Sequence, residues 1–224
     1  MILLNRWGIT SLPASLWPNR PLCPESLSPE IWSPPSDEFI KLNFDGASKG
    51  KAGYGGVFRN SLGQALYFFH GYIGQDTNNA AELEGLIHGL QLAYYKDWFP
   101  LIVEGDSKII LKMAANIQNG RAATKVSSHW RLEGRLERLG DMMKSSEACI
   151  WSHVRRKGNK VADRLANLGV VAKVHFWHGP MQNLPSREIQ DEFQCLIEQD
   201  WGHPDANDTL QCDRVNASCH DHSD

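Results

Sequence analysis

Four acidic side chains are the residues of this sequence best suited to chemistry, spaced 37, 24 and 57 positions apart: Asp45, Glu82, Asp106 and Asp163. Carboxylates brought together repel each other and destabilise a fold unless cations neutralise them. Such hard oxygen ligands favour Mg²⁺, with Mn²⁺ as an alternative, because Mg²⁺ binds a few carboxylates, several waters and a substrate phosphate. Two ions about 3.5–4 Å apart could activate a water and stabilise the leaving oxygen of a phosphodiester. Taken singly, each acid also fits the cap of a strand or a helix.

The elements that must position the first two acids follow from the hydrophobic pattern. Apolar and polar residues alternate in three segments, which predict the strands of an antiparallel meander at 39–45, 53–60 and 65–73. Asp45 ends the first of these strands. Apolar residues at helical spacing then predict a helix over 78–95, which Thr77 is placed to cap, with Glu82 one turn inside it.

The other two acids lie in the second half of the pattern. Its predicted elements are strands at 101–106 and 148–154 and helices at 107–116, 125–144 and about 162–168. Asp106 ends the first of these strands and Asp163 begins the last helix. The order β-β-β-α-β-α-α-β-α predicts an α/β domain that ends near Val171. Helices packed on its sheet could bring Glu82 and Asp163 over the neighbouring ends of the first and fourth strands.

The two ends of the chain differ in composition from this domain. Residues 1–36 hold seven prolines, a density that excludes the interior of a helix or sheet, so we expect an extended leader or linker. We place the folded domain at 37–171. Residues 172–224 are expected to form an acidic, largely disordered tail, in which 188–199 could form a short helix.

Charge is unevenly distributed along the chain. The net charge is −3, but residues 40–170 hold 18 Lys and Arg against 12 Asp and Glu. A basic body favours a polyphosphate partner, although an excess of this size is also ordinary variation. Five scattered cysteines argue against a disulfide framework, and the sequence lacks a signal peptide and a membrane-spanning apolar run. We therefore expect an intracellular protein, nuclear or cytoplasmic, that is neither secreted nor bound to a membrane.

The segments around the four acids resemble the ribonuclease H family, type 1, and most closely the reverse transcriptase-like domains of plant retroelements. The matching motifs, which occur in the family's order, are LNFDGASKG, TNNAAELEGLIHGL, VEGDSKII and HVRRKGNKVADRLANLG. The resemblance implies an α/β, ribonuclease H-like fold with a five-stranded mixed sheet flanked by helices. It also implies catalytic and metal-ligand roles for all four acids, with two Mg²⁺ or Mn²⁺ ions.

By the same resemblance, the expected activity is an endonuclease that hydrolyses the RNA strand of RNA/DNA hybrids by a two-metal-ion mechanism. The expected partner is the hybrid itself, bound by a monomer, with the reverse transcriptase of a parent retroelement as a further candidate. The alternative is a catalytically silent nucleic-acid-binding module of the same fold. An integrase-like transferase is disfavoured, because its third acid is a glutamate where this sequence has Asp163.

Several residues near the acids are candidates for substrate binding: Gly46, Ser48, Thr77, Asn78, Asn79 and Arg156. Glycine could let the backbone approach a sugar-phosphate surface, or could merely shape a hairpin. The Thr-Asn-Asn segment matches the family and could bond the 2′-OH that marks RNA, but it fits a helix cap equally well.

Basic residues raise two further questions. Cellular members of the family carry a histidine in the loop before the last acid, whereas Arg156 occupies that place here and His153 is expected to belong to the preceding strand. Arg131, Arg135 and Arg138 line one face of the predicted helix at 125–144. This stripe predicts either a solvated face or a track for phosphates.

Overall fold

The computed structural model describes residues 31–121, 132–145 and 149–200. Its strands are β1 (Ile40–Ser48), β2 (Ala52–Arg59), β3 (Ala65–Gly74), β4 (Leu101–Gly105), β5 (Cys149–His153) and β6 (Trp177–Gly179). Its α-helices are α1 (Asn78–Lys96), α2 (Lys108–Gln118), α3 (Glu133–Ser145), α4 (Lys160–Ala172) and α5 (Arg187–Asp200). Two short 3-10 helices, η4 (Arg156–Gly158) and η5 (Met181–Asn183), precede α4 and α5.

The strands form one mixed sheet in the order β5-β4-β1-β2-β3-β6. The β1–β2, β2–β3 and β3–β6 pairs are antiparallel, whereas β1–β4 and β4–β5 are parallel. This is the predicted α/β, ribonuclease H-like arrangement, with six strands instead of five. The additional strand, β6, has only three residues, too few for a pattern of alternation to reveal it in the sequence.

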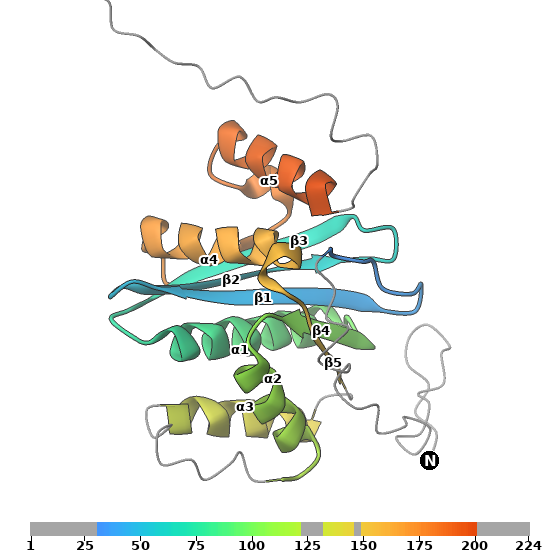
Figure 1. The fold of residues 1–224 in the computed structure, drawn as a ribbon, viewed down its shortest axis with the longest axis vertical. Helices are drawn as coiled ribbons and strands as arrows, with labels where there is room; N and C mark the ends of the chain where they lie inside the picture. Colours follow the sequence, from blue (N-terminus) through green and yellow to red (C-terminus); the bar gives the residue numbers. More distant parts are fainter. Residues whose placement is uncertain (1–30, 122–131, 146–148, 201–224) are drawn as a thin grey trace, which may run out of the picture.

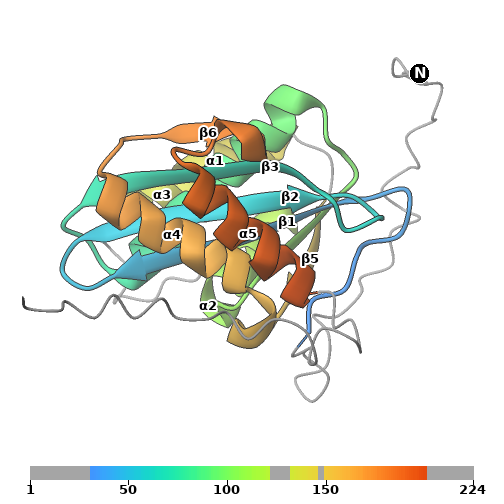
Figure 2. The ribbon, with the colours of Figure 1, turned by 90° about the horizontal axis from the view of Figure 1, so that it is seen from above.

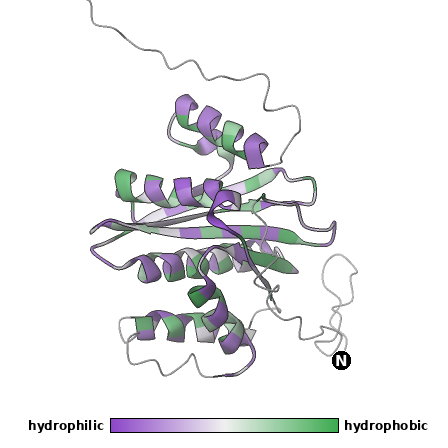
Figure 3. Ribbon diagram, viewed as in Figure 1, coloured by the Kyte–Doolittle hydropathy of each residue, from purple (hydrophilic) through white to green (hydrophobic). Residues whose placement is uncertain are grey.

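Helices cover both faces of the sheet, so the chain has two hydrophobic cores (Figure 1). On one face, Leu42 and Phe44 of β1 pack with Leu86 of α1 and with side chains of α2 and α3. On the other face, α4 and α5 lie side by side across the sheet (Figure 2) and bury Val57 and Phe68. Figure 3 shows α3 and α5 striped with hydrophilic and hydrophobic residues, as expected for helices with one buried face.

The folded unit is larger than the domain predicted from the sequence. The short helix expected at 188–199 is observed as α5, but residues 172–200 as a whole are not a disordered tail, because β6 extends the sheet beside β3 and α5 buries Phe193 and Ile197 in the second core. At the other end, Trp32 is only 3% exposed, so the folded unit begins before residue 37. The physical reason is that α4 alone leaves part of the second sheet face uncovered. Residues 1–30 and 201–224 of the predicted leader and tail lie outside the described residues.

The predicted helix over 125–144 lies partly outside the described residues, which resume at Leu132. Within the described part, the apolar side chains of this segment face the first core: Leu132 and Leu139 are buried, and Leu136 and Met143 pack against it. No helix in the described ranges is long and apolar enough to cross a membrane.

Candidate functional site

The structure brings three of the four predicted acids together. Asp45 lies in β1, Glu82 lies in the second turn of α1, and Asp106 directly follows β4. One carboxylate oxygen from each lies within 4.8 Å of the others. The strand register explains why Asp45 and Asp106 lie close together. Asn43 of β1 is aligned with Glu104 of the parallel strand β4, and Asp45 and Asp106 follow these residues by two positions.

Glycine allows the helix that carries Glu82 to approach the strand that carries Asp45. A Cβ atom on Gly46 would overlap the backbone of Ala81 and Glu82, and a Cβ atom on Gly85 would lie 2.9 Å from the Asp45 carbonyl oxygen. Both positions therefore require glycine for α1 to lie against β1. This gives Gly46 a packing role that the sequence did not reveal, while its contact with substrate stays a prediction.

The fourth acid, Asp163, lies beside the cluster and not within it. It is half-buried in the first turn of α4, and its charge contributes to the raised pKa of Asp45. Gly55 of β2 permits this placement, because a Cβ atom there would meet Leu165 of α4. Asn167, one turn further along α4, donates a hydrogen bond to the Asp163 backbone oxygen at 2.8 Å and lies 3.4 Å from its carboxylate.

The clustered acids carry more negative charge than their surroundings balance. Burial, with the charge of Asp106 second, raises the pKa of Asp45 to about 8. Burial, with the charge of Asp45 second, raises the pKa of Glu82 to about 10. The Oε2 atom of Glu82 is buried and has no hydrogen-bond partner among the described residues. A buried, unpartnered carboxylate oxygen on an acid that lies close to two other acids fits a divalent cation, which would supply both the missing positive charge and the missing partner.

Arg156 is a basic side chain that reaches this cluster. Its Nε lies 3.4 Å from the Asp106 carboxylate, but the side chain is 79% exposed, so it offsets little of the negative charge. It belongs to η4, in the loop before α4, as the sequence predicted. His153 is the last residue of β5, which confirms its placement in a strand, and its Nε2 lies 3.2 Å from the Asp106 backbone oxygen.

Apart from Arg156, the residues predicted to bind substrate lie at or near the start of α1. The Thr77 hydroxyl accepts a hydrogen bond from the Ala80 backbone at 3.2 Å, which confirms the predicted helix cap. Asn78 is exposed, and its amide nitrogen lies 3.5 Å from Glu82 Oε1. Asn79 follows and is half-buried. The Ser48 hydroxyl donates to the Asp76 carbonyl at 2.7 Å, so it ties the end of β1 to the segment before the helix.

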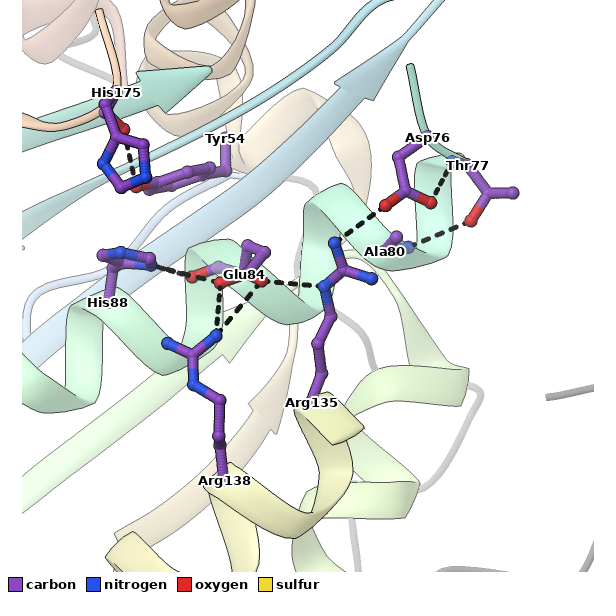
Figure 4. Close-up of polar contacts among 9 residues, drawn as sticks. All are labelled: Tyr54, Asp76, Thr77, Ala80, Glu84, His88, Arg135, Arg138 and His175. Carbon is purple, nitrogen blue, oxygen red and sulfur yellow. Dashed lines mark hydrogen bonds and ion pairs between the residues drawn. The ribbon is translucent and has the colours of Figure 1, made fainter. Parts of the chain in front are cut away.

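Two arginines of α3 also act on this segment (Figure 4). The guanidinium of Arg135 binds Asp76 and Glu84, each at 2.7 Å, and Arg138 lies 3.3 Å from Glu84. Arg135 therefore forms ion pairs within the protein and is only 21% exposed, whereas Arg138 is 48% exposed beside Glu84 and fits the predicted solvated face. Arg131 lies outside the described residues.

The charge of Glu84 is accommodated differently from that of its neighbour Glu82. Burial raises its pKa, but hydrogen bonds from His88 and Arg135 and the charge of Arg138 together lower the pKa to about 2. Glu84 is thus ionised and paired, whereas Glu82 two residues earlier lacks such partners. Sequence reasoning missed this network, although Glu84 and His88, one helical turn apart in α1, together with the arginine stripe were a usable signal.

Known proteins with similar sequences and structures place this site in a family. Residues 43–169 match the family described as Reverse transcriptase-like. An Arabidopsis thaliana protein named "Putative ribonuclease H protein At1g65750" is 31% identical over 139 residues, which are 61% of this chain and 21% of that protein. The chain thus spans about a fifth of the length of that curated relative.

The fold is shared by many solved structures, among them three ribonuclease H proteins. RNase H1 from Halobacterium salinarum NRC-1 is 26% identical, with a TM-score of 0.50 over 59% of this chain and 98% of that one. The N-terminal RNase H domain of Rv2228c from Mycobacterium tuberculosis is 30% identical, with a TM-score of 0.51 over 60% and 94%. LC11-RNase H1 in complex with an RNA/DNA hybrid is 28% identical, with a TM-score of 0.51 over 59% and 97%. Because the family match covers more than half of the chain and these structural relatives are RNase H1 proteins, the chain belongs to the reverse transcriptase-like family of ribonuclease H proteins.

Proposed function

We propose that this chain is an endonuclease that hydrolyses the RNA strand of RNA/DNA hybrids with two divalent metal ions, Mg²⁺ first and Mn²⁺ as an alternative. The observation that carries the proposal is the convergence of three carboxylates within 4.8 Å, one of which has a buried oxygen without a partner. A site that is only structural would pair or neutralise these acids, as the nearby Glu84 is paired.

The residues that would hold the ions are Asp45, Glu82 and Asp106, joined by Asp163 from α4. When bound, the ions would supply an activated water and stabilise the departing oxygen of the cleaved phosphodiester. The chain's own contribution is to hold the carboxylates at fixed spacing, through the contact of α1 with β1 and the register of β1 with β4. Burial excludes water from around Asp45 and Glu82, which strengthens their attraction for a cation.

The start of α1 is the proposed contact for the hybrid. The exposed Asn78 lies beside Glu82, so a strand bound there would have its backbone next to the carboxylates. Asn78, Asn79 and Thr77 offer side-chain amides and a hydroxyl, which are the groups that read a 2′-OH. The exposed Arg156, beside Asp106, is suited to a phosphate. The hybrid seen with LC11-RNase H1 supports this class of substrate.

The proposal is tested by incubating the full chain and Mg²⁺ with labelled RNA/DNA hybrid, duplex RNA and duplex DNA. Cleavage confined to the RNA strand of the hybrid, and abolished by EDTA, would support it. Binding of the hybrid without cleavage, in Mg²⁺ and in Mn²⁺ alike, would favour the silent nucleic-acid-binding module. Equal cleavage of duplex RNA would refute the assigned substrate.

A further inference from the structure

A buried hydrogen-bonded network joins the three elements that carry Asp45, Asp106 and Asp163. Asn43 in β1 donates to Glu104 of the neighbouring strand β4, with an Nδ2–Oε2 distance of 2.9 Å. Asn159, the residue before α4, donates to the Phe44 carbonyl of β1 at 3.0 Å, and its side-chain oxygen lies 3.4 Å from Asn43 Nδ2. Asn43, Glu104 and Asn159 are each 2% exposed.

Each member of the network stands at a fixed short distance in sequence from one acid. Asn43 and Glu104 each precede their acid by two residues, and in a strand such residues share a face. Asn159 precedes its acid by four residues and accepts the helical hydrogen bond of the Asp163 amide at 3.0 Å. A bond between network members therefore fixes the relative placement of the carboxylates that follow them.

The network is closed by Trp32, which lies outside the family match. Its indole nitrogen donates to Asn43 Oδ1 at 2.8 Å, and the side chain is 3% exposed. Its ring also lies 4.3 Å from the Arg59 guanidinium, which forms an ion pair with Asp200 at 2.8 Å. Residues from both sides of the family match at 43–169 are thus connected to the network: Trp32 binds Asn43 directly, and Asp200 is linked to Trp32 through Arg59.

The charges of this region are balanced, unlike those of the acid cluster. Lys41 pairs with Glu104 at 3.3 Å, and Arg59 pairs with Asp200. Ser152 of β5 donates a further hydrogen bond to Glu104 at 3.3 Å. Because its charges are already paired, this region does not need a cation for neutralisation. Its contribution to metal binding would therefore be to position the neighbouring acids.

We infer that the network of Asn43, Glu104 and Asn159, closed by Trp32, is the positioning device that sets the spacing of the carboxylates for metal binding. The inference rests on the proposed function, since it concerns the same site. It assigns a part in metal binding to residues that touch no metal. Loosening the network therefore weakens the affinity for the ion without removing a ligand, as substitution of groups that orient metal ligands does.

The test measures Mn²⁺ binding to the full chain by titration, with free ion followed by electron paramagnetic resonance. Asn159→Ala removes the side-chain hydrogen bond that joins the residue before α4 to the Phe44 carbonyl of β1. Trp32→Phe removes one hydrogen-bond donor while keeping an aromatic ring. We expect Asn159→Ala to weaken Mn²⁺ binding about tenfold and Trp32→Phe by about threefold. Trp177→Phe is the matched control, because Trp177 lies in β6 at the far edge of the sheet, and its affinity should equal that of the wild type.

Cleavage kinetics give a second readout. The variants should need more Mg²⁺ for half-maximal rate, with an unchanged KM for the hybrid at saturating metal. Folded variants, verified by circular dichroism, that bind Mn²⁺ like the wild type would overturn the inference. If Asn159→Ala fails to fold, Trp32→Phe decides by the same criterion. A wild-type chain that binds no Mn²⁺ would instead refute the proposed function.

Discussion

Asp200→Ala tests whether the C-terminal helix is an integral part of the fold. Asp200 is the last residue of α5, and its carboxylate lies 2.8 Å from Arg59 Nη2. The two side chains are only 2% and 1% exposed. Removal of Asp200 leaves the buried Arg59 guanidinium without its ion-pair partner, so that, among the described residues, it retains only the Trp32 ring and the charge of Glu104 as favourable interactions.

The expected loss of stability follows from the burial of the ion pair. Loss of one partner of a buried ion pair typically costs about 3–5 kcal/mol, because the remaining charge stays out of water. Domain stabilities are about 5–15 kcal/mol, so this is a large fraction. At about 2–4 °C per kcal/mol for a domain of this size, the midpoint of thermal unfolding should fall by about 6–20 °C.

A double substitution separates the charge effect from packing. Burial lowers the pKa of Arg59 and raises the pKa of Asp200 despite their pairing, so desolvation opposes both charges. Arg59→Met with Asp200→Leu should therefore be more stable than Asp200→Ala alone. Urea unfolding followed by circular dichroism measures all three proteins. An Asp200→Ala protein as stable as the wild type would show that α5 is not held as the structure describes.

The remaining predictions concern the site and its supports. Arg156→Ala should slow cleavage by about tenfold or a few times more, since an exposed assisting group supplies less than a metal ligand; an unchanged single-turnover rate would contradict this. Arg135→Gln should raise KM for the hybrid more than it lowers kcat, because it frees Asp76 before α1; an unaltered KM would refute that role. Without metal, the free energy of unfolding should fall as the pH rises from about 5 towards 9. The pKa values of Asp45 and Glu82 are raised in the folded chain, to about 8 and about 10, so the folded chain binds more protons than the unfolded chain over this range. Thermal melts in EDTA and in Mg²⁺ check this, and a fall equally steep in Mg²⁺ would contradict it.

Local patterns in the sequence predicted the elements that position the acids. Alternation located β1, the apolar run after Pro100 located β4, helical spacing located α1, and the Thr77 cap is formed. The structure brings Asp45, Glu82 and Asp106 together, as expected from acids at strand ends beneath a helix.

The features that were missed depend on contacts between distant parts of the chain. Arg59 and Asp200 are 141 residues apart, and no periodic pattern relates them. Trp32 sits among prolines, so composition suggested a linker although its ring fills a buried place. The helix expected at 188–199 is present as α5, but the acidic composition of residues 172–224 did not indicate that its apolar face packs in the second core.

The most direct test of the central claim compares the wild-type chain with Asp106→Asn on a labelled RNA/DNA hybrid in saturating Mg²⁺. The amide keeps the shape of the side chain and removes the charge that a metal ion requires. We predict that the wild type cleaves the RNA strand and that Asp106→Asn is slower by several thousandfold or more, at about the same affinity for the hybrid. An Asp106→Asn protein that cleaves at close to the wild-type rate would contradict the metal-dependent account.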